Sequence, residues 1–174
     1  MRILVTYHSD TGNTEKVAKA IHEEASKKGK ADLKKLKETK AEDLDQYDLV
    51  FLGSPCHAFD LSSPVKRMLA AIPKAPKYKL AGFITHMSPV AEKHEGHERC
   101  FSTFEKAIKE KQIDFKGIYD CQGVPALQIR EFVKKGLNVP DAEWEKHLRE
   151  MEKHPSVEDL QKAKEFARRV MSGI

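Results

Sequence analysis

The sequence predicts an α/β fold in which helices cover both faces of one doubly wound parallel sheet. Five short apolar runs recur along the 174 residues, each of a length typical of a buried parallel strand. The stretches between them carry apolar residues at helical spacing. Because strand and helix alternate, right-handed crossovers bring all five strands into one sheet, and a chain of this length fits a single domain over residues 1–174.

The expected strands are the apolar runs themselves, of which the second is the weakest. In chain order they are residues 2–7, 31–36, 49–54, 80–87 and 116–123. Between and after them, four amphipathic helices present apolar faces made of Val17, Ala18, Ile21 and Ala25; of Met68, Leu69 and Ile72; of Phe101, Phe104, Ala107 and Ile108; and of Leu160, Ala163, Phe166, Ala167 and Val170. We expect Gly29 to end the first helix in the left-handed conformation, which costs a glycine little.

An extra helical segment at about 124–155 interrupts the alternation between the fifth strand and the last helix. One helical piece ends near Gly136, and Pro140 opens a second piece with an apolar stripe made of Trp144, Leu148 and Met151. This stripe either packs over an edge of the sheet or contacts a partner, and a homodimer through 124–155 is one such contact.

Composition indicates a soluble globular protein, with 40% hydrophobic and 33% charged residues. The apolar run at the N-terminus turns polar too soon for a secretory signal, and no run approaches the roughly 18 apolar residues of a membrane helix, so we expect a cytoplasmic protein without membrane contact. Basic residues alternate with acidic ones and only 7% of residues are aromatic, which argues against nucleic-acid binding. The three scattered cysteines are expected to be reduced thiols.

The loop Ser9–Thr14 separates the first strand from the first helix. Loops of this kind face the crevice in which open parallel sheets bind ligands. Gly12 permits tight backbone geometry, while neighbouring hydroxyls, an amide and the N–H groups of the helix N-terminus can hold a dianionic phosphate. The stretch therefore predicts a phosphate cradle.

Several phosphate-binding families are excluded by their motifs. Neither G-x-x-x-x-G-K-[ST] nor G-x-G-x-x-G occurs, since Gly12 is the only glycine before Gly29. No cysteine is followed six residues later by the arginine of a phosphatase loop, and no aspartate ends the third strand as in a receiver domain.

The loop resembles the signature of the flavodoxin family, [ST]-x-T-G-x-T after the first strand, and matches it at every defined position. The resemblance extends through DLVFLGSPCHAFDLSSPVKRML and GFITHMS, which are similar to the family's third and fourth strands with the loops that follow them. It covers most of residues 1–121 and, less specifically, the last helix. It implies a flavodoxin-like three-layer sandwich with a five-stranded sheet.

The resemblance implies noncovalent FMN as cofactor and assigns residues to it. The phosphate would be held by the first loop, Ser9, Asp10, Thr11, Gly12, Asn13 and Thr14. The flavin ring would lie between two further groups, Ser54, Pro55, Cys56, His57, Ala58 and Phe59 on one side and His86, Met87, Ser88 and Pro89 on the other. Phe59 is the first choice for an aromatic ring stacked on the flavin.

The implied function is electron transfer between redox proteins, with no catalytic residue assigned because no acid, base or nucleophile constellation marks a substrate pocket. Two alternatives stay open: an FMN-dependent NAD(P)H or quinone-type reductase in which 124–155 walls a pocket, and a flavodoxin-like scaffold without cofactor. The net charge of +4 departs from the family's acidic electron carriers, so we expect a less negative potential for full reduction of the flavin.

A metal site is a further alternative. His94, His97 and Cys100 follow one another at steps of three, with His86 upstream, and these residue types ligate zinc or iron. On one helix such steps do not converge on a single point, so this reading requires part of the stretch to be a loop.

Overall fold

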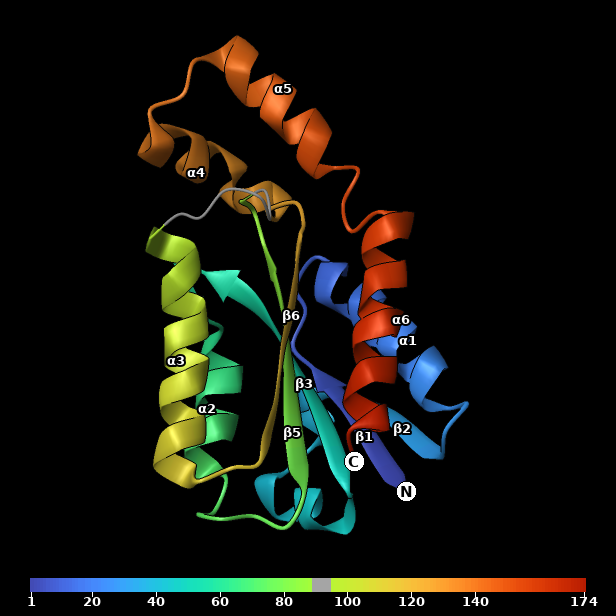
Figure 1. The fold of residues 1–174 in the computed structure, drawn as a ribbon. Coiled ribbons are helices and arrows are strands. Elements are labelled where there is room, and N and C mark those ends of the chain that lie inside the picture. Colours follow the sequence, from blue (N-terminus) through green and yellow to red (C-terminus); the bar gives the residue numbers. More distant parts are fainter. Residues whose placement is uncertain (89–94) are drawn as a thin grey trace.

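The computed structural model describes residues 1–88 and 95–174, and for residues 95–98 the backbone alone. Five parallel strands form one sheet in the order β2-β1-β3-β5-β6 (Figure 1). They are β1 (Arg2–Tyr7), β2 (Lys30–Lys35), β3 (Leu49–His57), β5 (Lys79–His86) and β6 (Phe115–Gln122). The predicted doubly wound parallel sheet of five strands is confirmed.

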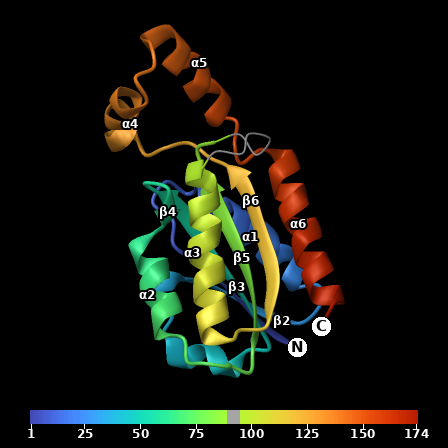
Figure 2. The ribbon, with the colours of Figure 1, turned by 60° about the vertical axis from the view of Figure 1, so that its left-hand side comes forward.

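Helices cover both faces of the sheet, as Figures 1 and 2 show. On one face lie α1 (Asn13–Ala25) and α6 (Val157–Ser172), and on the other lie α2 (Ser63–Ala71) and α3 (Glu95–Lys111). Alternate residues of the strands point to opposite faces, so Ile3 and Val5 pack in the core with Phe166, whereas Leu4 packs in the core with Phe104. The three-layer sandwich is therefore confirmed.

The region around β3 differs from the expectation. β3 runs on to His57, and its end pairs with the short antiparallel strand β4 (Asp60–Leu61). Between β2 and β3 the chain forms two 3-10 helices, η1 (Leu36–Glu38) and η2 (Ala41–Gln46). β2 is an edge strand without fully buried residues, which explains its weak apolar pattern.

Gly29 does not end a helix in the left-handed conformation, so that prediction was wrong. α1 ends at Ala25, and Gly12 and Gly117 are the glycines with positive φ in the described chain. A Cβ at Gly29 would lie 2.4 Å from the carbonyl oxygen of Met1. The glycine is thus required by the close approach of the chain's first residue.

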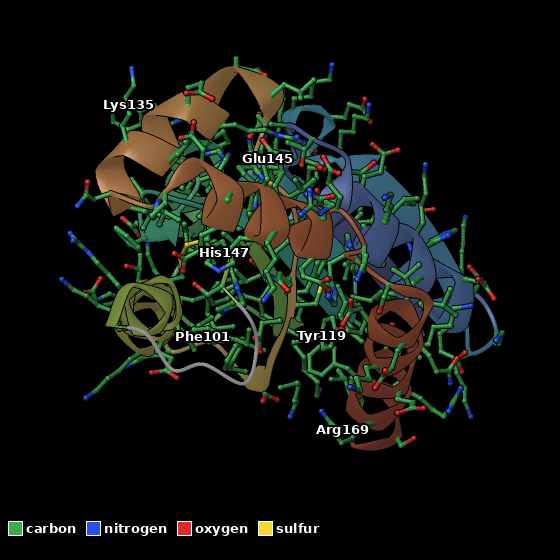
Figure 3. The ribbon with its side chains drawn as sticks, turned by 90° about the horizontal axis from the view of Figure 1, so that it is seen from above. Phe101, Tyr119, Lys135, Glu145, His147 and Arg169 are labelled. Carbon is green, nitrogen blue, oxygen red and sulfur yellow. A yellow bond between two sulfur atoms is a disulfide. The ribbon has the colours of Figure 1, made fainter. Side chains whose placement is uncertain are left out.

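The segment 124–155 arches over the carboxyl edge of the sheet, the edge at which the parallel strands end (Figures 1 and 2). It contains η3 (Leu127–Ile129), α4 (Arg130–Leu137) and α5 (Asp141–Met151). Figure 3 views this edge from above and shows α5 crossing it, with Glu145 and His147 on opposite sides of the helix. The stripe of α5 is largely buried, with Trp144 3% and Met151 4% exposed.

Polar contacts attach this segment to the phosphate loop and brace it internally. The side-chain amide of Asn13 donates to the carbonyl oxygen of Val124 at 2.9 Å, and the guanidinium of Arg130 lies 2.8 Å from the carboxylate of Glu152. None of the helices in the described ranges combines the length and the apolar character needed to cross a membrane.

Candidate functional site

The loop between β1 and α1 has the backbone of an anion cradle. Gly12 has φ of 87°, a left-handed conformation that side chains disfavour, and apart from its chain neighbours no atom of the described residues lies within 4 Å of where its Cβ would be. The hydroxyl of Ser9 accepts the N–H of Gly12 at 3.1 Å and that of Glu15 at 3.4 Å, which holds the loop closed on itself. Open space therefore faces the turn.

The first helical residues leave backbone donors unused. In the described parts of the chain, the backbone N–H groups of Asn13 and Thr14 have no hydrogen-bond acceptor, as is usual for the start of a helix. Their side chains, in contrast, are occupied, because Asn13 donates to Val124 and the hydroxyl of Thr14 lies 2.8 Å from that of Thr85. The side chains thus fix the helix, and the free N–H groups suit a phosphate dianion.

Asp10 joins two of the loops at this edge. Its carboxylate lies 2.9 Å from Nε2 of His57 and 3.2 Å from Nε2 of His8. The two imidazole rings approach each other edge to face, with centroids 6.2 Å apart. Asp10 is therefore placed to hold His57 of the second loop against the first loop.

The loop after β3 is braced from inside and exposed at its tip. Ser54 is fully buried, donates its hydroxyl to the carbonyl of Pro55 at 2.8 Å and accepts the N–H of Ser62 at 3.0 Å. Ala58 and Phe59 have positive φ, and Phe59 is 60% exposed. Hydrogen bonds at the base of the loop therefore support a tip at which the ring of Phe59 is exposed. Stacking on a flavin requires such an exposed aromatic ring.

Cys56 of this loop forms a disulfide with Cys100 of α3, so the expectation of three reduced thiols was wrong. The two Cα atoms are 6.4 Å apart, a usual separation for a disulfide. Figure 3 shows the sulfur pair beside α3. Cys121 is free and buried, and burial raises the pKa of its thiol to about 12.

The loop after β5 is tied to the end of β6. The imidazole of His86 is buried and lies 3.1 Å from the carboxylate of Asp120. The carbonyl of Met87 accepts the amide of Gln122 at 2.6 Å, and Met87 and Ser88 are partly exposed. Pro89, the last residue assigned to this side of the ring, lies outside the described residues.

The three predicted groups of residues thus meet at one edge of the sheet. The sequence model of the protein family described as "Flavodoxin domain" matches residues 4–168. The chain belongs to the flavodoxin domain family. Its parallel sheet and the helices on both faces are those that the sequence predicted for such a domain.

Known proteins resemble the chain over nearly its whole length. The flavodoxin-like domain-containing protein BilS of Clostridioides difficile is 29% identical over 98% of this chain and 97% of its own. An uncharacterised protein of Methanocaldococcus jannaschii is 27% identical over 98% and 99%. The crystal structure of oxidised flavodoxin 2 from Bacillus cereus is 20% identical, covers both chains fully and superposes with a TM-score of 0.69.

The metal site considered for His94, His97 and Cys100 loses one of its ligands in this flavodoxin domain. The sulfur of Cys100 is bonded to Cys56 and is no free thiolate, while His86 contacts Asp120. His94 lies outside the described residues, as does the side chain of His97. Among the described side chains, no cluster of three histidine, cysteine or acidic residues is arranged to hold a metal ion.

Sequence reasoning missed the partners that support the site. Thr85 and the carbonyl of Val124 hold residues of the loop after β1, and Asp120 holds His86 of the loop after β5. Each contact joins segments at least 34 residues apart, so no local pattern signals it.

Proposed function

We propose that this flavodoxin domain binds FMN noncovalently and carries electrons between redox proteins. The observation that carries the proposal is the loop Ser9–Thr14, which combines a left-handed Gly12 facing open space with unbonded N–H groups at the start of α1. This combination fits a phosphate monoester because the donors and the positive end of the helix dipole converge on one point.

The remaining loops would hold and orient the flavin ring. Phe59 offers an exposed ring for stacking, worth on the order of 1 kcal/mol beyond the area it buries. Met87 and Ser88 would border the opposite side, and the contact of His57 with Asp10 would keep the ring loop beside the phosphate loop. Bound FMN would supply one- and two-electron redox chemistry, which the protein tunes through its charges and its exclusion of water.

A titration of apo-protein with FMN, followed by quenching of flavin fluorescence, tests the proposal. Two variants of one position sharpen it: Gly12→Asp and Gly12→Asn. Asparagine and aspartate have the same shape and both tolerate left-handed backbone, so the variants differ in the charge that opposes the phosphate. We expect binding in the parent, weaker binding with Asn and a much larger loss with Asp. Absence of binding in the parent would favour the scaffold alternative.

A flavin-dependent reductase is the second candidate, favoured by the segment that arches over the carboxyl edge. Leu127 and Phe132 in this segment are 75% and 80% exposed, and such apolar side chains suit contact with an apolar substrate or partner. Steady consumption of NAD(P)H with a quinone acceptor would support the reductase. Reduction through a partner protein alone would support the carrier.

The partners are proposed from the same surface. Exposed apolar side chains beside the flavin site suit docking of a redox protein, since electrons pass most readily over short distances. A homodimer through 124–155 would use the same side chains. Sedimentation of the parent and of Phe132→Ser would show whether these side chains join two copies of the chain or are left for a redox partner.

A further inference from the structure

A half-open cavity with a volume of about 590 Å³ lies beside the phosphate loop. It is lined by the ends of β1 and β2, by η1, by the start of η2 and by α2, and it meets the phosphate loop at Ser9. Its volume falls within the range of small-molecule sites. None of the residues assigned to the two sides of the flavin ring lines it.

The cavity combines apolar walls with four cations. Leu36 and Met68 supply buried apolar surface, at 6% and 8% exposure. The cationic residues of the lining are Lys35, Lys37, Lys40 and Arg67. Lys35, Lys37 and Lys40 belong to one basic stretch around η1, and the fold brings Arg67 of α2 beside them.

In the described part of the chain no carboxylate lies within ion-pair distance of these four cations, although Glu15, which pairs with Lys19, also attracts Lys35 from further away. The nearest acidic residues of the same segment serve the backbone. Glu38 accepts the N–H of Lys35 at 3.3 Å, and Asp43 accepts the N–H of Lys40 at 3.3 Å. The neighbouring Lys66, in contrast, is paired with Asp60 at 2.7 Å. The cavity therefore keeps an excess of positive charge.

We propose that this cavity binds a small organic acid, a compound with an apolar body and one or more carboxylate, sulfonate or phosphate groups. The apolar body would lie against Leu36 and Met68, and the acidic groups would meet Lys37 and Arg67. A bare anion would leave the apolar wall unfilled and a neutral apolar compound would leave the cations unpaired, so neither uses the whole lining. The site shares Ser9 with the loop proposed for the phosphate, but it uses none of the residues assigned to the flavin ring, and its proposal does not depend on FMN binding.

The test uses the fluorescent probe 8-anilinonaphthalene-1-sulfonate and its uncharged analogue N-phenyl-1-naphthylamine. The double variant Lys37→Gln/Arg67→Gln removes two cations of the cavity. The matched control Lys106→Gln/Lys109→Gln removes two exposed cations of α3, outside the cavity.

We expect one molecule of the sulfonate to bind per chain, about tenfold more weakly in the cavity variant and unchanged in the control. The uncharged analogue should bind more weakly than the sulfonate, and the cavity substitutions should leave its affinity unchanged. Equal loss in the two double variants would overturn the proposal by placing the probe elsewhere. The probe should be displaced by a small aromatic acid at lower concentrations than by hexaglutamate. If hexaglutamate displaces the probe at the same or lower concentrations, the proposal is overturned in favour of an acidic protein partner.

Discussion

The imidazole of His57 lies 2.9 Å from the carboxylate of Asp10, and this contact joins the loop after β3 to the loop after β1. The two side chains are 47% and 46% exposed, so the pair contributes little to overall stability. Its position matters more than its strength, because it connects the loop proposed for the phosphate with the loop proposed for the flavin ring.

A double-mutant cycle with Asp10→Ala and His57→Ala should show coupling in FMN affinity. We expect each single variant to weaken binding and the double variant to lose less than the sum, with a coupling of about 0.5 to 1 kcal/mol. Additive losses would show that the contact does not serve the flavin.

The architecture could be predicted because short, local patterns in the sequence indicate it. Runs of buried residues indicate parallel strands, and the turn around Gly12 carries its own signature within six residues. The supporting contacts could not be predicted in this way. Asn13 and Val124 are 111 residues apart, and Cys56 and Cys100 are separated by 44, so their pairing follows from the fold and not from any spacing in the sequence.

Sequence-based prediction is limited in the same way for the loop that follows β3. Phe59 could be proposed for stacking because it follows the third strand. The left-handed turn that exposes it could not be predicted, because Ala58 and Phe59 are not residues that favour positive φ. The antiparallel strand β4 is too short to produce a pattern of its own, and it forms only because the chain turns back on β3.

The disulfide predicts a definite count of reactive thiols. The native protein should show almost no reaction with a thiol reagent, because the remaining free cysteine, Cys121, is buried and its pKa is raised to about 12. Unfolding without reductant should expose one thiol, and unfolding with reductant three. Three thiols in the unreduced unfolded protein would contradict the bond.

Removing the disulfide should also destabilise the chain. We expect Cys100→Ser to lower the free energy of unfolding by about 2 to 4 kcal/mol, because the bond restricts the unfolded chain between two residues with a sequence separation of 44. Denaturant unfolding of oxidised parent, reduced parent and variant measures this loss. The reduced parent and the variant should agree, and an unchanged midpoint in both would show that the crosslink does not contribute.

Glu24 should make stability depend on pH in the acid range. Its carboxylate is 5% exposed and lies 3.0 Å from Arg168 of α6 and 2.8 Å from Lys27. Hydrogen bonds from Arg168 first, and then from Lys27, lower its pKa to about 2. Because this pKa is depressed in the folded state, the stabilisation is complete above the ordinary carboxylate range near 4.5 and is lost as pH falls towards 2.

The variant Glu24→Gln measures this contribution. It should be less stable than the parent at pH 7 by about 1 to 3 kcal/mol, and the difference should shrink as the pH approaches 2. The control Glu158→Gln removes an exposed carboxylate of α6 that pairs with Lys162, and little change is expected there. A constant difference between parent and Glu24→Gln from pH 7 to pH 2 would show that the carboxylate's charge is not what stabilises the contact between the helices.

The charge around the ring loop should raise the potential at which FMN is fully reduced. Fully reduced flavin is an anion when deprotonated, and a positive charge about 10 Å away stabilises it by roughly 0.4 to 1.7 kcal/mol, or about 20 to 70 mV. Among the basic residues near the loops, Lys66 is neutralised by Asp60 at 2.7 Å, while Arg67 and Arg99 are exposed. Asp60→Asn would release the charge of Lys66 and keep the acceptor for the N–H of Leu61.

Potentiometry of FMN-loaded parent and Asp60→Asn tests this electrostatic argument. Loss of a negative charge beside the site should shift full reduction to a less negative potential, by about 20 to 70 mV. Asp114→Asn is the matched control, because Asp114 pairs with Lys116 at the same 2.7 Å but stands at the start of β6, at the opposite edge of the sheet. An equal shift in both variants would mean that net charge alone acts, and no shift in Asp60→Asn would mean that solvent screens the pair from the flavin.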